Sequence, residues 1–447
     1  MTTLLRLALS CCLISLAACS RGTSSTPSTL NPGQTAPVVP SFSIYYQPIK
    51  SGQDLSKLGK VNVIVTSRQL DDAAAVKAIH AHGAKAFRYI QSYWFPSGQT
   101  YDGLDIGKHL DWADCTSGSD PLLGRVQGGH QWYFLDANER AARQWFVDLL
   151  HTLRSEGYDG VMFDRGLAAL TGVDNHAANI WYRPSTCTQN PVSKGATPAD
   201  AYVGLMREVH KAGLQLFQNY GLSPFDPGNP FRPDPSDPAC QRRQYATCRH
   251  VEDGIQSVDY FLDEAVAHPK DANWRDDYAA NLAGEHDRHF GGKIVGVITQ
   301  GNLGGDVSRA AVFFEFARVR LFNVPVAIFT GDKQCSGGTG VCNRQGLYPE
   351  LATADFGRPF GTEPQSVNCI SGSSVNCVWV RQYEHAISAV NVSDTAAQVT
   401  IKLAAGGCQH VTDLESGTPL EQDRCVSSVS LQLAPWSGRP LLLRKSG

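Results

Sequence analysis

Residues 157–164 read GYDGVMFD, in which a turn glycine precedes a short apolar run that ends in a carboxylate. Such a run is typical of a strand buried on both faces, as in a parallel sheet. A carboxylate that ends a strand of this kind lies at the carboxyl edge of the sheet, where it faces ligand rather than core. The segment therefore predicts an α/β protein with Asp164 as its first candidate functional residue.

Seven further apolar runs flank this segment, with amphipathic stretches between them. The eight predicted strands cover residues 42–46, 61–66, 84–91, 158–164, 214–219, 258–263, 293–299 and 325–330. The predicted helices cover residues 71–82, 138–156, 201–212, 274–290 and 308–322. This alternation favours a (β/α)8 TIM barrel over residues 42–368. An open doubly wound sheet is the alternative, but no glycine-rich phosphate-binding turn follows the first strand.

Beyond residue 368 the helical pattern stops, and six short alternating runs follow with turn residues between them. This pattern predicts a small C-terminal antiparallel β-sandwich over residues 369–447. A structural role, in which the sandwich packs against the barrel, is the favoured interpretation. A glycan-binding module that uses Trp436 is the alternative.

The N-terminal segment has the composition of a targeting sequence. Residues 1–18 combine Arg6 with an apolar stretch too short to span a bilayer, which predicts a signal peptide. Residues 16–19, LAAC, resemble a bacterial lipoprotein box, which implies that Cys19 is lipidated. Residues 19–41 are rich in Ser, Thr and Pro and predict a flexible tether. We therefore expect a protein of the bacterial cell envelope, lipid-anchored to a membrane on its extracytoplasmic side, with ordinary secretion as the alternative.

Cysteine usage agrees with export. Of 13 cysteines, those beyond the N-terminal segment are even in number, as expected for disulfides in an oxidising compartment. Their spacing suggests the pairs Cys115 with Cys187, Cys240 with Cys248, Cys335 with Cys342, Cys369 with Cys377, and Cys408 with Cys425. Sequence alone does not fix this connectivity. No Cys/His cluster has zinc-ligand spacing, so we expect no catalytic metal and no cofactor.

Composition narrows the possible classes of protein. The 447 residues are 42% hydrophobic and 18% charged, which excludes a disordered chain. The 39 basic and 42 acidic side chains leave a formal charge of -3. A chain without positive charge in excess does not bind nucleic acid through bulk electrostatics.

A family resemblance rests on residues 132–138, WYFLDAN, which lead through a predicted helix into GYDGVMFD. This unit resembles the polygalactosaminidase-type glycoside hydrolases of family 114 and the related hypothetical glycosyl hydrolase family 15. The resemblance is firm from residue 135 to residue 164 and looser along the rest of the barrel. It implies a TIM barrel that hydrolyses a glycosidic bond with two acids, one at the end of the fourth strand and one at the end of the sixth.

Asp164 and Glu264 match the two acid positions of the family. Asp263 is the alternative second acid. Because neighbouring residues in a strand face opposite sides, we expect only one of Asp263 and Glu264 to face the substrate. Arg165 stands where the family often has a further acid, and a cation there favours an ionised Asp164. We therefore expect Asp164 to be the nucleophile or general base and Glu264 the general acid.

Other strand ends supply polar and aromatic side chains that suit sugar hydroxyls and ring faces. Asp136 either binds substrate or caps the following helix. The candidate substrate-binding residues are Tyr46, Gln91, Trp94, Asp136, Arg165, Asn219, Asp263, Gln300 and Asp332. The expected function is glycoside hydrolysis on a polysaccharide or oligosaccharide. The alternative is a non-catalytic glycan-binding lipoprotein on the same scaffold, and the oligomeric state stays open.

Overall fold

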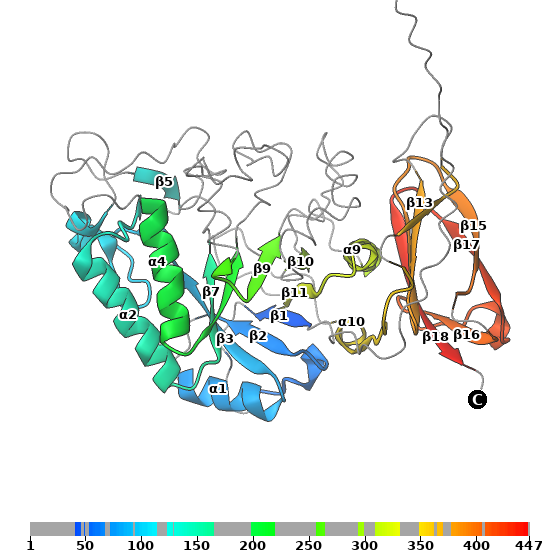
Figure 1. Ribbon diagram of the computed structural model, residues 1–447, viewed down its shortest axis with the longest axis horizontal. Helices are drawn as coiled ribbons and strands as arrows, with labels where there is room; N and C mark the ends of the chain where they lie inside the picture. The colour runs from blue at the N-terminus through cyan, green and yellow to red at the C-terminus, as the bar shows by residue number, and fades with distance from the viewer. Residues whose placement is uncertain are drawn as a thin grey trace, which may run out of the picture. The chain divides into compact units, whose positions relative to one another are not determined.

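The computed structural model describes residues 41–45, 49, 53–67, 72–92, 94–113, 123–127, 129–164, 198–219, 256–263, 294–298, 309–330, 348–361, 364–369, 377–404 and 407–445. Within these ranges the chain forms a parallel barrel followed by antiparallel sheets (Figure 1). None of the helices in the described ranges is long and apolar enough to cross a membrane.

Eight parallel strands close into one barrel, and each lies within or close to a strand predicted from the sequence. They are β1 (Phe42–Tyr45), β2 (Val63–Thr66), β3 (Lys85–Gln91), β7 (Gly160–Asp164), β8 (Gln215–Asn219), β9 (Tyr260–Asp263), β10 (Ile294–Ile298) and β11 (Val326–Thr330). Each strand pairs with its neighbours along the chain, and β11 pairs with β1 to complete the ring. The prediction of a closed parallel barrel is confirmed.

Alternate residues of the strands fill the inside of the barrel. A buried cluster contains Phe42 of β1, Phe87 of β3, Met162 of β7, Phe217 of β8 and Leu262 of β9. Because side chains alternate along a strand, this cluster fixes which residues at the strand ends face the mouth.

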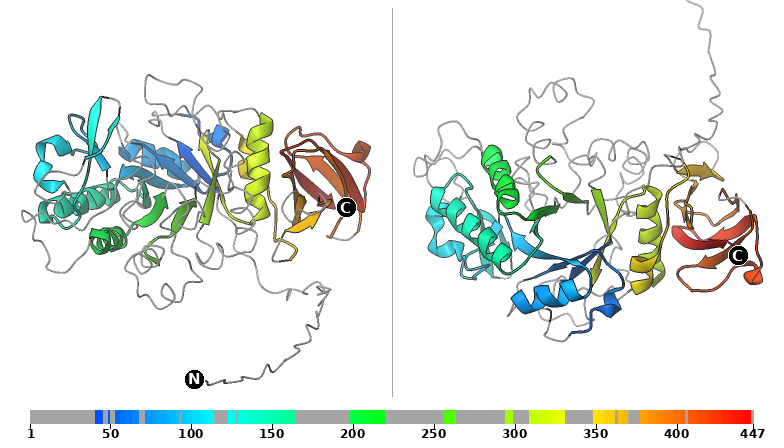
Figure 2. Two further views of the ribbon diagram at one scale, coloured as in Figure 1. Left: turned by 90° about the horizontal axis from the view of Figure 1, so that it is seen from above. Right: turned by 60° about the horizontal axis from the view of Figure 1, so that its bottom comes forward.

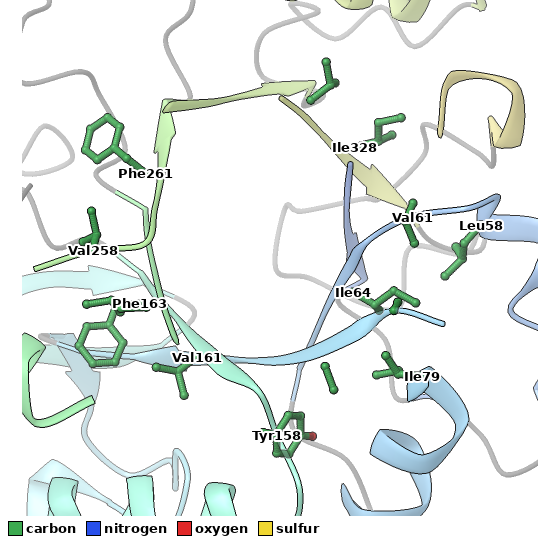
Figure 3. Packing of buried hydrophobic residues seen from close by; sticks show 14 of the residues in the cluster. Leu58, Val61, Ile64, Ile79, Tyr158, Val161, Phe163, Val258, Phe261 and Ile328 are labelled. Carbon is green, nitrogen blue, oxygen red and sulfur yellow. The ribbon is translucent and has the colours of Figure 1, made fainter. Parts of the chain in front are cut away.

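Helices pack on the outside of the strands (Figure 2). They are α1 (Asp72–Ala81), α2 (Arg140–Ser155), α4 (Pro198–Lys211), α9 (Arg309–Leu321) and the short α10 (Pro349–Thr353). The outward side chains Val161, Phe163 and Phe261 lie around the ring of strands in Figure 3 and belong to the largest apolar cluster. The helix predicted at residues 274–290 lies outside the described residues.

Two histidine–aspartate contacts repeat at the start of barrel strands. Asp159, just before β7, lies 2.8 Å from His80 Nε2 of α1 and accepts the backbone N–H of Ala86 in β3 at 2.8 Å. Asp259, just before β9, lies 2.9 Å from His210 Nε2 of α4 and accepts a backbone N–H of β8 at 2.8 Å. The two aspartates therefore hold equivalent positions in strands that lie two apart in the barrel.

The segment after β3, for which the sequence predicts no strand or helix, contains regular structure. A small antiparallel sheet of order β4-β6-β5 forms from β4 (Trp94–Pro96), β5 (Leu123–Gln127) and β6 (His130–Phe134). Two short 3-10 helices, η2 (Ile106–Lys108) and η3 (Leu110–Trp112), follow β4. Buried Phe95, Leu104 and Ile106 pack with Leu135 and give this excursion its own small core.

The C-terminal region is antiparallel, as predicted. One sheet contains β12 (Gln365–Val367), β13 (Val378–Gln382), β14 (Ala386–Asn391), β16 (Gln409–Asp413) and β18 (Ser437–Lys445), and the other contains β15 (Ala397–Lys402) and β17 (Ser428–Leu433). Buried apolar side chains of both sheets form one cluster. The pairs Cys369–Cys377 and Cys408–Cys425 are disulfides, which confirms two predicted pairs. The other three pairs lie outside the described residues.

Helix α9 contacts the C-terminal sheet along one side. Phe314, Ala317 and Leu321 of α9 form a buried cluster with Val390 and Val392. The carbonyl oxygens of the last turns of α9 accept side-chain hydrogen bonds from β13, β14 and the turn between them. The C-terminal region thus supports a barrel helix, as the favoured structural interpretation predicts.

Candidate active site

Asp164 is the last residue of β7, and its side chain faces the mouth of the barrel. Met162, two residues earlier, belongs to the interior cluster, so the alternation of the strand directs Asp164 to the same side. The residue is 9% exposed. A carboxylate at the carboxyl end of a barrel strand lies on the face where such proteins bind ligands.

Side chains from two neighbouring strands hold both carboxylate oxygens of Asp164. The hydroxyl of Tyr89 in β3 donates to Oδ2 at 2.5 Å, and Nδ2 of Asn219 in β8 donates to Oδ1 at 3.0 Å. Hydrogen bonds to an ionised acceptor are among the stronger ones in proteins. They fix the plane of the carboxylate, which is what a nucleophile or general base requires.

Gln91 lies directly opposite Asp164 in the register of β3 and β7. Its Nε2 donates to the Tyr89 hydroxyl at 3.3 Å, and the residue is 5% exposed. Its buried Oε1 has no hydrogen-bond partner among the residues that the structure describes. Because buried acceptors are nearly always satisfied, this oxygen suits a hydroxyl or amide N–H donor of a ligand.

A second, fully buried network supports Asp164 from behind. The hydroxyl of Ser92 donates to the backbone carbonyl of Asp164 at 2.9 Å and lies 2.6 Å from the hydroxyl of Tyr202 on α4. Tyr202 donates to Gln218 Oε1 at 3.1 Å, and Gln218 Nε2 donates to the carbonyl of Phe163 at 3.2 Å. Burial raises the pKa of Tyr202, so its hydroxyl stays protonated. The network ties the end of β7 to β8 and α4.

Two aromatic residues of the excursion after β3 pack together, and one of them, Tyr101, lies near this carboxylate. Tyr101 is partly buried, and this burial together with the charges of Asp102 and Asp164 raises the pKa of its phenol. Its ring lies 6.2 Å from that of Trp132 in β6. Flat rings beside a fixed carboxylate suit the apolar face of a sugar.

Asp136 is almost completely buried at 1% exposed. It accepts the backbone N–H of Asn138 at 2.8 Å, whereas the residue that caps α2 is Glu139, whose carboxylate accepts the N–H of Ala141. The interpretation of Asp136 as the helix cap is therefore wrong, because the helix begins later than the sequence suggests. Burial raises its pKa to about 6.

The structure brings together three of the predicted site residues, namely Asp164, Gln91 and Asn219. Asp136 lies in the segment that connects β6 to α2. For Trp94 and Asp263 the structure describes only the backbone. The predicted residues outside the described ranges are Tyr46, Arg165, Glu264, Gln300, Asp332 and Cys19.

Tyr89 is a site residue that the sequence pattern did not predict. It stands two residues before Gln91 in the same strand. Strand alternation therefore puts both on one face, and this signal was present in the sequence. The described ranges contain no group of three potential metal ligands, and the expectation of no metal stays a prediction.

Comparison with solved structures finds several glycoside hydrolases at low identity. A GH27 β-L-arabinopyranosidase from Geobacillus stearothermophilus is 11% identical, with a TM-score of 0.48 over 91% of this chain and 97% of that one. The glycoside hydrolase domain of PelA from Pseudomonas aeruginosa is 16% identical, with a TM-score of 0.39 over 65% of this chain and 94% of that one. An α-amylase of Anoxybacillus is 11% identical, with a TM-score of 0.46 over 91% of this chain and 98% of that one. These values are too low to transfer an activity.

No family model matches the sequence, and no curated protein sequence matches it either.

Proposed function

We propose that the protein is a glycoside hydrolase that cleaves a polysaccharide or oligosaccharide with two carboxyl groups, Asp164 and Glu264. The observation that carries the proposal is the carboxylate of Asp164, which ends the fourth barrel strand with both oxygens held by donors. Glycosidic hydrolysis needs such a fixed carboxylate on one side of the sugar and a proton donor on the other.

The alternation of β9 supports Glu264 over Asp263 as the second acid. Tyr260 and Leu262 pack with the interior cluster, whereas Phe261 belongs to the cluster outside the barrel. The even-numbered residues of β9 thus face the interior, and Glu264 has the same parity in the sequence whereas Asp263 has not.

The repeated aspartate contacts support the same choice. Asp159 and Asp259 make matching contacts with a helix histidine and with the preceding strand. The side chains of β7 and β9 therefore alternate between the inside and the outside of the barrel in the same order. Asp164 follows the first of them by as many residues as Glu264 follows the second. The two acids therefore occupy equivalent sequence positions relative to the barrel.

The spacing of the strands suits a carboxyl pair. One strand, β8, separates β7 from β9. Neighbouring strands lie about 4.8 Å apart, so the two strand ends lie roughly 10 Å apart. Side chains that lean into the mouth from these ends can reach the separations of about 5 to 9.5 Å found between glycosidase carboxyls.

In the proposed reaction, Asp164 attacks the anomeric carbon or activates a water, and Glu264 protonates the leaving oxygen. Gln91 Oε1 accepts a hydrogen bond from the sugar, and Tyr101 and Trp132 contact its ring face. The remaining predicted contacts at Tyr46, Trp94, Arg165, Asn219, Gln300 and Asp332 belong to the same proposed cleft.

The experiment compares Asp164→Asn and Glu264→Gln with the control Asp263→Asn, and measures reducing ends released from a panel of neutral, acidic and amino-sugar polysaccharides. We expect the first two variants to lose a factor of about 100 or more in kcat and the control to keep most of its activity. Unchanged release by either of the first two variants would remove that residue from the mechanism.

Non-catalytic glycan binding is the second candidate function. Gln91 Oε1, which has no hydrogen-bond partner within the described part of the chain, and the two aromatic rings favour this function, because binding through them needs no second acid. Binding without release of reducing ends by the parent protein, measured by affinity electrophoresis on the same panel, would select this alternative.

We further propose that the mature chain is anchored through a lipid on Cys19 and acts outside the cytoplasm. A Cys19→Ser variant is expected to move from the membrane fraction to the soluble fraction.

We infer that the two C-terminal sheets form a small sandwich, supported by the apolar cluster that they share.

A further inference from the structure

Arg88 is a buried cation on the outside of the barrel wall. It lies in β3 between Phe87 and Tyr89, which face the interior, and it is 2% exposed. Its Nη2 donates to Asp102 Oδ1 at 2.7 Å, and the side chain of Asp102 is itself 7% exposed. Removing two charges from water is costly, so a buried ion pair contributes little net stability to the fold. A role other than stability therefore has to be considered for this pair.

Asp102 lies in a tight turn. The backbone N–H groups of Tyr101 and Leu104 each donate to the carbonyl of the other, at 2.7 and 2.8 Å. The two residues between them, Asp102 and Gly103, have φ values of 48° and 92°. Positive φ at both central positions is the type I′ turn, for which Asp-Gly is a favoured pair. A turn of this kind couples the position of Asp102 rigidly to that of Tyr101.

Tyr101 carries this coupling to the candidate site. Its phenol lies near Gln91 and Asp164, which stand opposite each other in the register of β3 and β7. Its ring lies 6.2 Å from that of Trp132. The turn therefore connects a buried ion pair outside the barrel wall to an aromatic ring beside the carboxylate inside the mouth.

We propose that Arg88 and Asp102 form a latch that sets the position of Tyr101, so that Tyr101 contacts one sugar ring of the glycan bound at Asp164. Arg88 and Asp102 are positioning residues, and Tyr101 determines how tightly that ring binds. This inference rests on the proposed glycan site.

Other contacts also hold Arg88 and the excursion after β3. Asp72 at the start of α1 also lies near the guanidinium, 3.9 Å from Nε. The excursion has its own apolar core around Phe95 and Leu104. What the contact with Asp102 adds is a fixed position for the tip of the turn.

The test is a double-mutant cycle of Asp102→Asn and Tyr101→Ala. Asparagine tolerates positive φ, so the first change keeps the turn and removes the charge. We expect KM for the cleaved polysaccharide to rise about fivefold to tenfold in each single variant, with a smaller change in kcat. The double variant should show no larger rise than Tyr101→Ala alone, because both changes remove one contact.

Glu208→Gln is the matched control, because it breaks the Arg143–Glu208 ion pair of 2.8 Å between α2 and α4. It should lower Tm without a change in KM. Hydrogen exchange gives a readout without ligand, and Asp102→Asn should speed exchange of the Tyr101 and Leu104 amides. If the KM changes of the two single variants add up in the double variant, or if KM is unchanged in Asp102→Asn, the latch is refuted.

Failure of the proposed hydrolysis leaves this test intact. If the parent chain releases no reducing ends, the same four proteins are compared by their Kd on the polysaccharide that retards them in affinity electrophoresis. A Kd for the double variant no weaker than that for Tyr101→Ala alone then supports the latch on a binding protein. Additive changes in the free energy of binding refute it.

Discussion

Tyr89 is the closest support of the candidate carboxylate, since its hydroxyl lies 2.5 Å from Asp164 Oδ2. A hydrogen bond to a charged group contributes about 1.5–3 kcal/mol. Tyr89→Phe is therefore expected to lower kcat by about 10-fold to 100-fold, because Asp164 loses a donor that fixes the plane of its carboxylate. Tyr133→Phe is the control, because that hydroxyl donates to exposed Gln131. Equal kcat values for the two variants would contradict the assigned role of Tyr89.

Asp136 should make stability depend on pH. Its pKa is about 6 in the folded chain against 3.8 for the free group, because burial disfavours the charged form. The folded state therefore binds the proton more tightly, and its stabilising contribution is complete below pH 3.8 and lost as pH rises through 6.

Asp136→Asn removes this titration while its amide oxygen can still accept the N–H of Asn138. Urea denaturation should show the variant more stable than the parent by about 1–3 kcal/mol at pH 8 and nearly equal at pH 4. A variant less stable than the parent at pH 8 would show that the ionised Asp136 has a stabilising partner.

At the scale of elements, helix α9 depends on donors from outside the barrel. Arg381 of β13 is 6% exposed, and its Nη1 donates to the carbonyl of Leu321, the last residue of α9, at 2.9 Å. A cation at a helix C-terminus stabilises the helix dipole and satisfies a free carbonyl. Arg381→Met should cost about 1–3 kcal/mol in urea denaturation. Arg444→Met, at an exposed position of β18, should change stability by less than about 0.5 kcal/mol.

The barrel strands could be predicted because most of them are short runs rich in apolar residues between turn residues, as in residues 160–164. The small sheet after β3 could not, because β5 includes Gly124 and Arg125 and lacks a clear alternation of apolar residues. The start of α2 was misplaced for a related reason, since several polar residues before it suit a cap equally well. Contacts between distant segments, such as Arg88 with Asp102, carry no local signal at all.

At the scale of the whole molecule, barrel and C-terminal sheets should unfold together. Tyr383, Ala386 and Leu414 of the C-terminal region belong to the same buried cluster as the outer side chains of the barrel strands. Elements that share a buried core lose it in one cooperative step. Differential scanning calorimetry of the full chain should therefore show a single transition. Two separate transitions would mean that the shared cluster contributes little to either part.

The donors that hold α9 come 60 to 71 residues later in the chain than the carbonyls that they serve. Helix α9 leads into β11, the strand that joins β10 to β1. A nascent polypeptide thus emerges with all eight barrel strands before the residues that secure the last helix have been synthesised. A premature stop codon ahead of Arg381 should accordingly remove the entire protein from the cell by proteolysis, and not merely shorten it.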